Sequence, residues 1–176
     1  MAAELTGAYL TLDDGRPAVR FSRTYHHPIG RVWQFVTDPE ELAHWFPSRM
    51  EIEPRTGGVI RFGGDPDLED STGTVLAVDV PRHLSFDRGG DELRFDLEAL
   101  DDRRTRFTLT NVLQSADTAA RNGAGWEVCL AALDARARGE DFEGAHAGHT
   151  PARDRCYAAY IETGIPSGAP VPGVGA

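Results

Sequence analysis

The segment from His27 to Pro47 constrains this chain most, because it predicts two consecutive short helices. Pro28 and Pro39 each suit the first position of a helix, where a missing N–H group costs nothing. In the first helix the apolar residues follow the spacing of one helical face: Ile29, Val32, Trp33 and Val36. Pro39 disfavours helical geometry in the residue before it, so Asp38 ends the first helix and caps the second. We expect the two helices to meet at nearly a right angle, with a strand on each side.

Strand-like alternation of apolar and polar residues fills most of the chain on either side of this segment. We predict strands over residues 8–12, 17–25, 48–53, 59–62, 73–80, 84–87, 93–98 and 106–110. Short turns join them, such as Asp13-Asp14-Gly15, in which glycine is available for positive φ. Short strands at this regular spacing are typical of an antiparallel meander rather than of a parallel sheet.

The period then changes from two to 3.6, which predicts one long helix over residues 117–138 that ends near Gly139. Its apolar stripe consists of Trp126, Leu130, Leu133 and Ala137. A twisted sheet and a single long helix bury their apolar faces only if the helix lies across the concave side. We therefore predict an α+β fold in which the two short helices close one end, leaving an apolar cavity between sheet and helix.

These residues also carry a family resemblance. The run Arg23-Thr24-Tyr25 through Trp45-Phe46-Pro47 resembles the first half of START-like helix-grip (SRPBCC) proteins. More narrowly, it resembles the branch named after the activator of the heat-shock-protein-90 ATPase. Gly57-Gly58, Thr108-Leu109-Thr110 and Gly125-Trp126 are similar to later landmarks of that branch. The resemblance implies a helix-grip fold but little about function, because the family includes chaperone activators, lipid carriers and polyketide cyclases.

We accordingly divide the chain into a helix-grip domain over 1–139, an extension over 140–164 and a tail over 165–176. The extension contains one short helix that Thr150-Pro151 begins and Gly164 ends. The tail is rich in Pro, Gly and Val without periodicity, so we expect it to be flexible.

The composition excludes several classes of function. The 176 residues carry a formal net charge of −10, which argues against binding to the phosphates of nucleic acids. No apolar run approaches the ~20 residues that span a bilayer, and the N-terminus lacks a signal pattern, so we expect no membrane partner and a cytoplasmic location. Cys129 and Cys156 are too few for a disulfide framework and suit a reducing compartment.

Side chains on the predicted inner faces are the candidates for a ligand site. Trp45 and Phe46 follow the second short helix, at a position that faces the cavity mouth in this fold, although core packing explains them as well. Asn111 shares its strand face with Phe107 and Leu109, and a buried amide there needs partners from the protein or from a ligand. The predicted ligand-binding residues are Trp45, Phe46, Phe62, Phe95, Leu97, Phe107, Leu109, Asn111, Trp126, Leu130 and Leu133.

Catalytic and metal motifs are scarce. No nucleophile elbow, zinc-protease motif or phosphate-binding loop occurs, so we predict no cofactor. His146 and His149 have metal-like spacing but no third ligand nearby in sequence, so we predict no metal site.

We therefore expect a non-catalytic domain that binds a small apolar or amphipathic molecule. A polyketide cyclase or hydrolase stays open as an alternative, with Tyr25, Arg61, His83 and Asn111 as candidate groups. A chaperone-associated interaction protein is a second alternative, and a homodimer through a sheet edge is compatible with the pattern.

Overall fold

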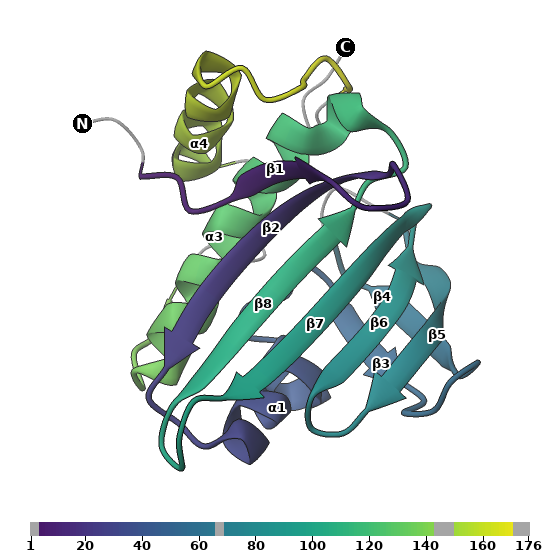
Figure 1. The fold of residues 1–176 in the computed structure, drawn as a ribbon, viewed down its shortest axis with the longest axis vertical. Helices are drawn as coiled ribbons and strands as arrows, with labels where there is room; N and C mark the ends of the chain where they lie inside the picture. Colours follow the sequence, from purple (N-terminus) through teal and green to yellow (C-terminus); the bar gives the residue numbers. More distant parts are fainter. Residues whose placement is uncertain (1–3, 66–68, 143–149, 171–176) are drawn as a thin grey trace.

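The computed structural model of the chain describes residues 4–65, 69–142 and 150–170. An eight-stranded antiparallel sheet has the order β1-β2-β8-β7-β6-β5-β4-β3 (Figure 1). Its strands are β1 (Ala8–Thr11), β2 (Pro17–Tyr25), β3 (Arg49–Ile52), β4 (Val59–Gly63), β5 (Ser71–Asp79), β6 (His83–Arg88), β7 (Asp91–Ala99) and β8 (Thr105–Val112). The helices are α1 (Ile29–Thr37), α2 (Pro39–Leu42), the 3-10 turn η1 (Ala116–Thr118), α3 (Ala119–Ala137) and α4 (Pro151–Glu162).

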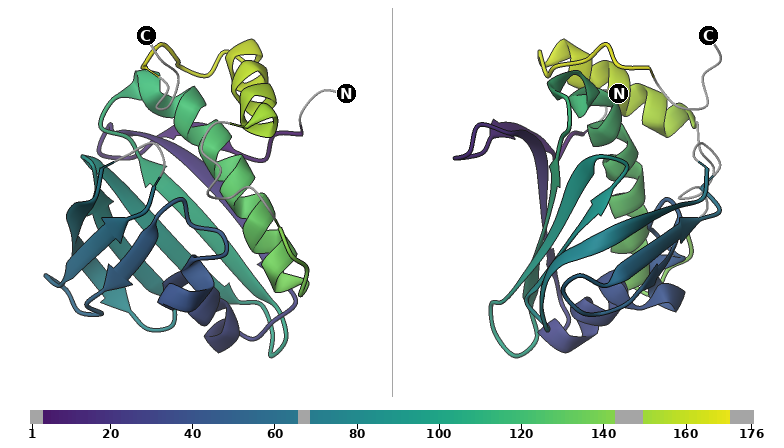
Figure 2. Two further views of the ribbon diagram at one scale, coloured as in Figure 1. Left: turned by 180° about the vertical axis from the view of Figure 1, so that it is seen from behind. Right: turned by 90° about the vertical axis from the view of Figure 1, so that its right-hand side faces the viewer.

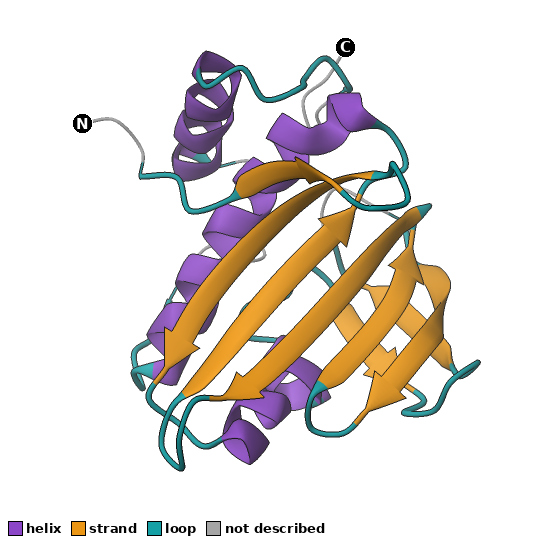
Figure 3. Ribbon diagram, in the orientation of Figure 1, coloured by secondary structure: helices purple, strands orange, loops and turns teal. Residues whose placement is uncertain are grey.

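The long helix α3 lies across the concave face of the sheet, and the β3–β5 end of the sheet bends around the space beside it (Figure 2). Helices α1 and α2 close the end of this space that lies away from the start of α3 (Figure 3). This arrangement confirms the predicted α+β helix-grip fold. None of the described helices is both long enough and apolar enough to cross a bilayer.

The core between helix and sheet is built mainly from aromatic rings. Trp45 contacts Phe95 and Phe107 with ring centroids 5.9 and 6.4 Å apart, and its indole Nε1 donates to the carbonyl of Phe35 at 2.8 Å. The strand register places Phe95 opposite Leu109 and Leu97 opposite Phe107, so the inner face of β7 and β8 is continuous. These rings fill the part of the space between α3 and the sheet that lies next to α1 and α2.

Local signals predicted the ends of the elements well. The Asp38 carboxylate accepts a hydrogen bond from the backbone N–H of Glu40 at 2.9 Å, so the predicted N-cap is confirmed. The second helix ends at Leu42, and Trp45 and Phe46 follow it, as expected, and are buried in the core. The predicted strand boundaries agree with the observed ones to within about two residues.

Residues 165–170 pack against the start of α3. The backbone N–H of Ala120 donates to the carbonyl of Pro166 at 3.0 Å, and Ala169 N–H donates to Asp117 at 3.4 Å. Ile165 packs against the buried core. The described residues 165–170 therefore contact the start of α3. The flexible tail over 165–176 stays a prediction.

Glu127 joins three distant parts of the chain on the outer side of α3. This carboxylate, 8% exposed, accepts from the backbone N–H groups of Thr6 at 2.7 Å and Gly7 at 3.0 Å. It also accepts from the Thr6 hydroxyl at 2.8 Å and from the Tyr160 hydroxyl of α4. Four donors therefore converge on one carboxylate, which ties the N-terminus and α4 to the long helix.

Glu127→Gln should lower the free energy of unfolding by about 2 kcal/mol. The carboxylate has two acceptor oxygens for these donors, whereas the amide has only one. Chemical denaturation monitored by circular dichroism measures this loss. The matched change at the exposed Glu162 of α4 should shift the unfolding free energy by less than about 0.5 kcal/mol. Equal effects of the two substitutions would show that the Glu127 network does not stabilise the fold.

Glu41 of α2 clamps the short helices to α3. Its carboxylate accepts two hydrogen bonds from Arg136, at 2.8 and 3.1 Å, and pairs with Arg31 of α1 at 3.1 Å. The hydrogen bonds from Arg136, followed by those from Arg31, hold the pKa of Glu41 below its usual value of 4.5 against the opposing effect of burial. A bidentate pair of this kind fixes orientation as well as distance.

Because the pKa of Glu41 is lowered by folding, its contribution is present above the ordinary value of 4.5 and is lost as pH falls through the folded pKa. Glu41→Gln should therefore destabilise the protein by about 1 kcal/mol at pH 7, and the difference from wild type should shrink as pH falls below the ordinary pKa of 4.5. Thermal unfolding across this pH range tests it, with Glu40→Gln as the exposed neighbouring control. A difference that grows on acidification would contradict the proposed sign.

Candidate functional site

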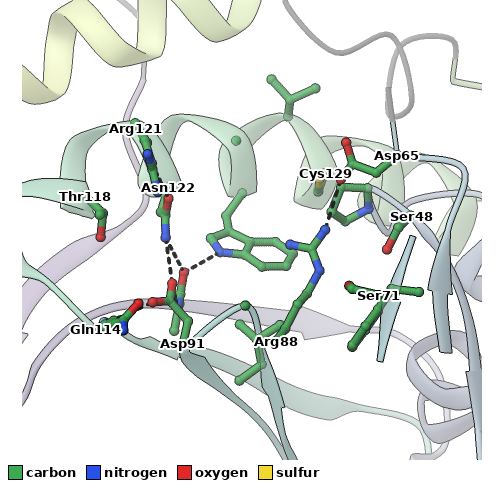
Figure 4. A pocket seen from close by; sticks show the side chains of 18 of the residues that line it. Ser48, Asp65, Ser71, Arg88, Asp91, Gln114, Thr118, Arg121, Asn122 and Cys129 are labelled. Carbon is green, nitrogen blue, oxygen red and sulfur yellow. Dashed lines mark hydrogen bonds and ion pairs between the residues drawn. The ribbon is translucent and has the colours of Figure 1, made fainter. Parts of the chain in front are cut away.

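A pocket of about 430 Å³ opens between the first half of α3 and the sheet, on the side where β3–β6 bend away (Figure 4). Its apolar floor is formed by Phe62 of β4, Leu93 of β7 and Trp126 of α3. Phe46 lies directly beneath, with its ring centroid 5.7 Å from Trp126 and 6.5 Å from Phe62. The aromatic core therefore ends where the pocket begins.

One end of the pocket is a saturated polar network. The Asn111 Oδ1 accepts from the Trp126 indole at 3.0 Å and from the Asn122 amide at 3.1 Å. The Asp91 Oδ2 in turn accepts from the amides of Asn111 at 3.0 Å and Asn122 at 2.9 Å, and its Oδ1 accepts from the Gln114 N–H at 2.9 Å. The partners of the buried Asn111 amide thus come from the protein itself.

The other end carries an ion pair. The Arg88 guanidinium donates to Asp65 at 3.0 Å, with only 18% and 10% of the two side chains exposed. Its guanidinium carbon also lies 5.4 and 5.6 Å from the ring centroids of Phe46 and Phe62, so the cation rests against the aromatic floor. Burial raises the pKa of the neighbouring Cys129 thiol to about 12, which keeps it protonated.

The pocket brings together three of the eleven predicted ligand-binding residues, Phe62, Asn111 and Trp126. The other eight pack in the buried core and do not line the pocket: Trp45, Phe46, Phe95, Leu97, Phe107, Leu109, Leu130 and Leu133. Ring-to-ring contacts among Trp45, Phe86, Phe95 and Phe107 fill the space that the sequence alone left open.

The four candidate catalytic residues do not converge. His83 and Asp96 lie on the face of the sheet that points away from α3, with 2.7 Å between the His83 Nδ1 and the Asp96 carboxylate. The Tyr25 hydroxyl donates to Asp134 at 2.8 Å near the far end of α3, and Arg61 is exposed on the outward side of β4. Only Asn111 of the four belongs to the pocket wall. The pair His146 and His149 lies outside the described residues, so its reading stays a prediction.

Several lining residues were missed by the sequence reasoning. Leu93 has the same strand parity as Phe95, and Asn122 lies one helical turn from Trp126, so extending each apolar stripe by one step would have found both. Arg88 and Asp91 flank a predicted glycine turn, and nothing in their spacing indicates that this turn borders a pocket. Ser48 and Asp65 likewise carry no local signal.

Known proteins with similar sequences and structures bear on this site. The sequence model of the family described as "Activator of Hsp90 ATPase homolog 1-like protein" matches residues 26–138. No curated protein matches the chain.

Among solved structures, CalU16 from Micromonospora echinospora is 23% identical, with a TM-score of 0.67, over 94% of this chain and 98% of its own. A conserved protein of unknown function from Enterococcus faecalis, EF2215, is 19% identical, with a TM-score of 0.70, over 89% of each chain. DynU16, from the dynemicin biosynthetic locus, is 23% identical, with a TM-score of 0.57, over 85% of this chain and 48% of its own. At these identities the likeness establishes the fold alone.

Asn111→Leu keeps the size of this side chain but removes the acceptor that Trp126 and Asn122 share. Both donors then remain without that partner, so we expect a loss of about 2 kcal/mol in the free energy of unfolding. We also expect a changed near-ultraviolet circular dichroism signal, because the indole is no longer held in one orientation. Gln114→Leu, at an exposed lining position, is the control, and an equally large loss there would contradict the role of the network.

Proposed function

We propose that this chain, which belongs to the Activator of Hsp90 ATPase homolog 1-like family, binds a small amphipathic molecule between α3 and the sheet. The observation that carries the proposal is the pocket of about 430 Å³ with an aromatic floor and polar groups at both ends. Apolar pockets in this size range, with a few placed polar groups, are the usual sites for small ligands.

The lining of the pocket suits a molecule with aromatic rings. Phe62 and Trp126 offer apolar surface along its length, while the Asn111–Asp91 network and the Arg88–Asp65 pair mark its two ends. Burial of rings supplies most of the binding free energy, and the polar ends orient the molecule. DynU16 is described as a protein of a biosynthetic locus, which supports a biosynthetic small molecule as the ligand.

The two alternatives rest on less. A cyclase or hydrolase needs at least two titratable side chains that converge on a substrate, and three of the four candidates lie away from the pocket. A chaperone-associated role and a homodimer stay predictions that follow from the family resemblance and the acidic composition.

Gly125 provides a direct test because it lines the pocket and a Cβ atom added there has nothing within 4 Å. Gly125→Leu should fill the pocket without strain and reduce the affinity for N-phenyl-1-naphthylamine, a neutral fluorescent probe, on the order of tenfold. Replacing a helical glycine should also raise stability by about 0.5–1 kcal/mol. Fluorescence titration and thermal unfolding measure the two effects.

The matched control is Gly30→Leu, the same change in α1 at an exposed position that also has nothing within 4 Å of the added Cβ. This variant should bind the probe as wild type does. Undiminished binding by the Gly125 variant would place the probe elsewhere on the protein. Absence of any fluorescence gain with wild type would argue against a binding role for the pocket.

A further inference from the structure

Ser48 lines the pocket, and its buried hydroxyl group has no hydrogen-bond partner in the part of the chain that the structure describes. The residue is 1% exposed and lines the pocket between Pro47 and the first residue of β3. Across the described residues, its Oγ is the one buried side-chain nitrogen or oxygen atom that makes no hydrogen bond. An unsatisfied buried hydroxyl destabilises a fold, so a position that retains one calls for a function.

The groups around Ser48 describe what it would bind. Figure 4 shows Ser48 at the same end of the pocket as Asp65, Arg88 and Ser71, whereas Asp91 and Asn122 lie at the other end. The Arg88 cation is already paired with Asp65 at 3.0 Å and rests against Phe46 and Phe62. An anionic ligand at this end would meet the Asp65 carboxylate and would lose its own hydration without gaining an unpaired cation.

The formal charges of the described lining residues agree with this reading. Among them, three basic residues, Arg88, Arg121 and Arg153, are balanced by three acidic ones, Asp65, Glu69 and Asp91. The complete chain, by contrast, carries a net charge of −10. The described lining therefore carries no excess charge of one sign, which is what attracts charged ligands.

We propose that Ser48 Oγ is the specificity-determining group of this pocket and that its ligand is an uncharged aromatic molecule with a hydroxyl or keto oxygen at the Arg88 end. This inference rests on the proposed binding function. A serine hydroxyl donates to a keto oxygen or accepts from a hydroxyl group, so it recognises either one. At the other end, the side chains of Asn111, Asp91 and Asn122 already bond to one another.

The test compares three probes of similar shape as competitors of N-phenyl-1-naphthylamine: 2-naphthol, 2-methylnaphthalene and 2-naphthoate. Ser48→Ala should weaken 2-naphthol about fivefold and leave 2-methylnaphthalene within about twofold, because only the former loses a hydrogen bond. In wild type, 2-naphthoate should bind more weakly than 2-naphthol. Ser48→Ala should unfold at the same or a higher temperature, since it removes an unsatisfied buried group.

Ser22→Ala is the matched control, because this exposed serine of β2 does not line the pocket. It should leave the affinities of all three probes unchanged. Equal losses for 2-naphthol and 2-methylnaphthalene in Ser48→Ala, or no loss for either, would overturn the role of Ser48 while the binding function stands. Tightest binding of 2-naphthoate would overturn the uncharged ligand. Failure of N-phenyl-1-naphthylamine to bind wild type would remove the binding function itself.

Discussion

The contact between Trp126 and the inner face of the sheet determines how the rest of the molecule is arranged. Its indole donates to Asn111 on β8 at 3.0 Å, and its ring packs on Phe46 at 5.7 Å. A buried indole N–H needs such a partner, and a buried amide needs such a donor, so the two residues fix α3 at one height above the sheet. On the side of this contact that α1 and α2 close, the helix packs directly on the sheet. Toward the start of α3, the pocket separates the two.

The pocket lies where it does because the aromatic rings are unevenly distributed along this interface. Trp45, Phe95 and Phe107 fill the end that α1 and α2 close, so no space remains there. Toward the start of α3, Gly125 has no side chain, and the β3–β5 end of the sheet bends away (Figure 2). Dense aromatic packing at one end and a glycine at the other explain why the pocket lies beside the start of α3.

The two ends of the pocket differ in how their polar groups are satisfied. Asp91, Asn111 and Asn122 bond to one another, and such a closed network holds its geometry without a ligand. The Arg88–Asp65 pair is closed in the same way, while the Ser48 hydroxyl beside it is not. The apolar floor thus lies between a polar network that is complete within the protein and the unsatisfied Ser48 hydroxyl. Because the network already holds its side chains in place, little ordering of side chains would accompany binding.

The sequence by itself determined the secondary structure, the helix-grip arrangement and the faces of the residues, because period, capping and strand parity are local properties. The Asp38-Pro39 boundary and the shared face of Phe95 and Leu97 are examples. Strand parity also put Asn111 on the inner side, and the helical stripe did the same for Trp126. Tertiary structure alone decided which inner residues meet across the interface and which face a void, because that distance depends on all the side chains packed between α3 and the sheet. The unsatisfied Ser48 hydroxyl follows from the same cause, since hydrogen-bond partners distant in sequence are assigned only when the chain is folded.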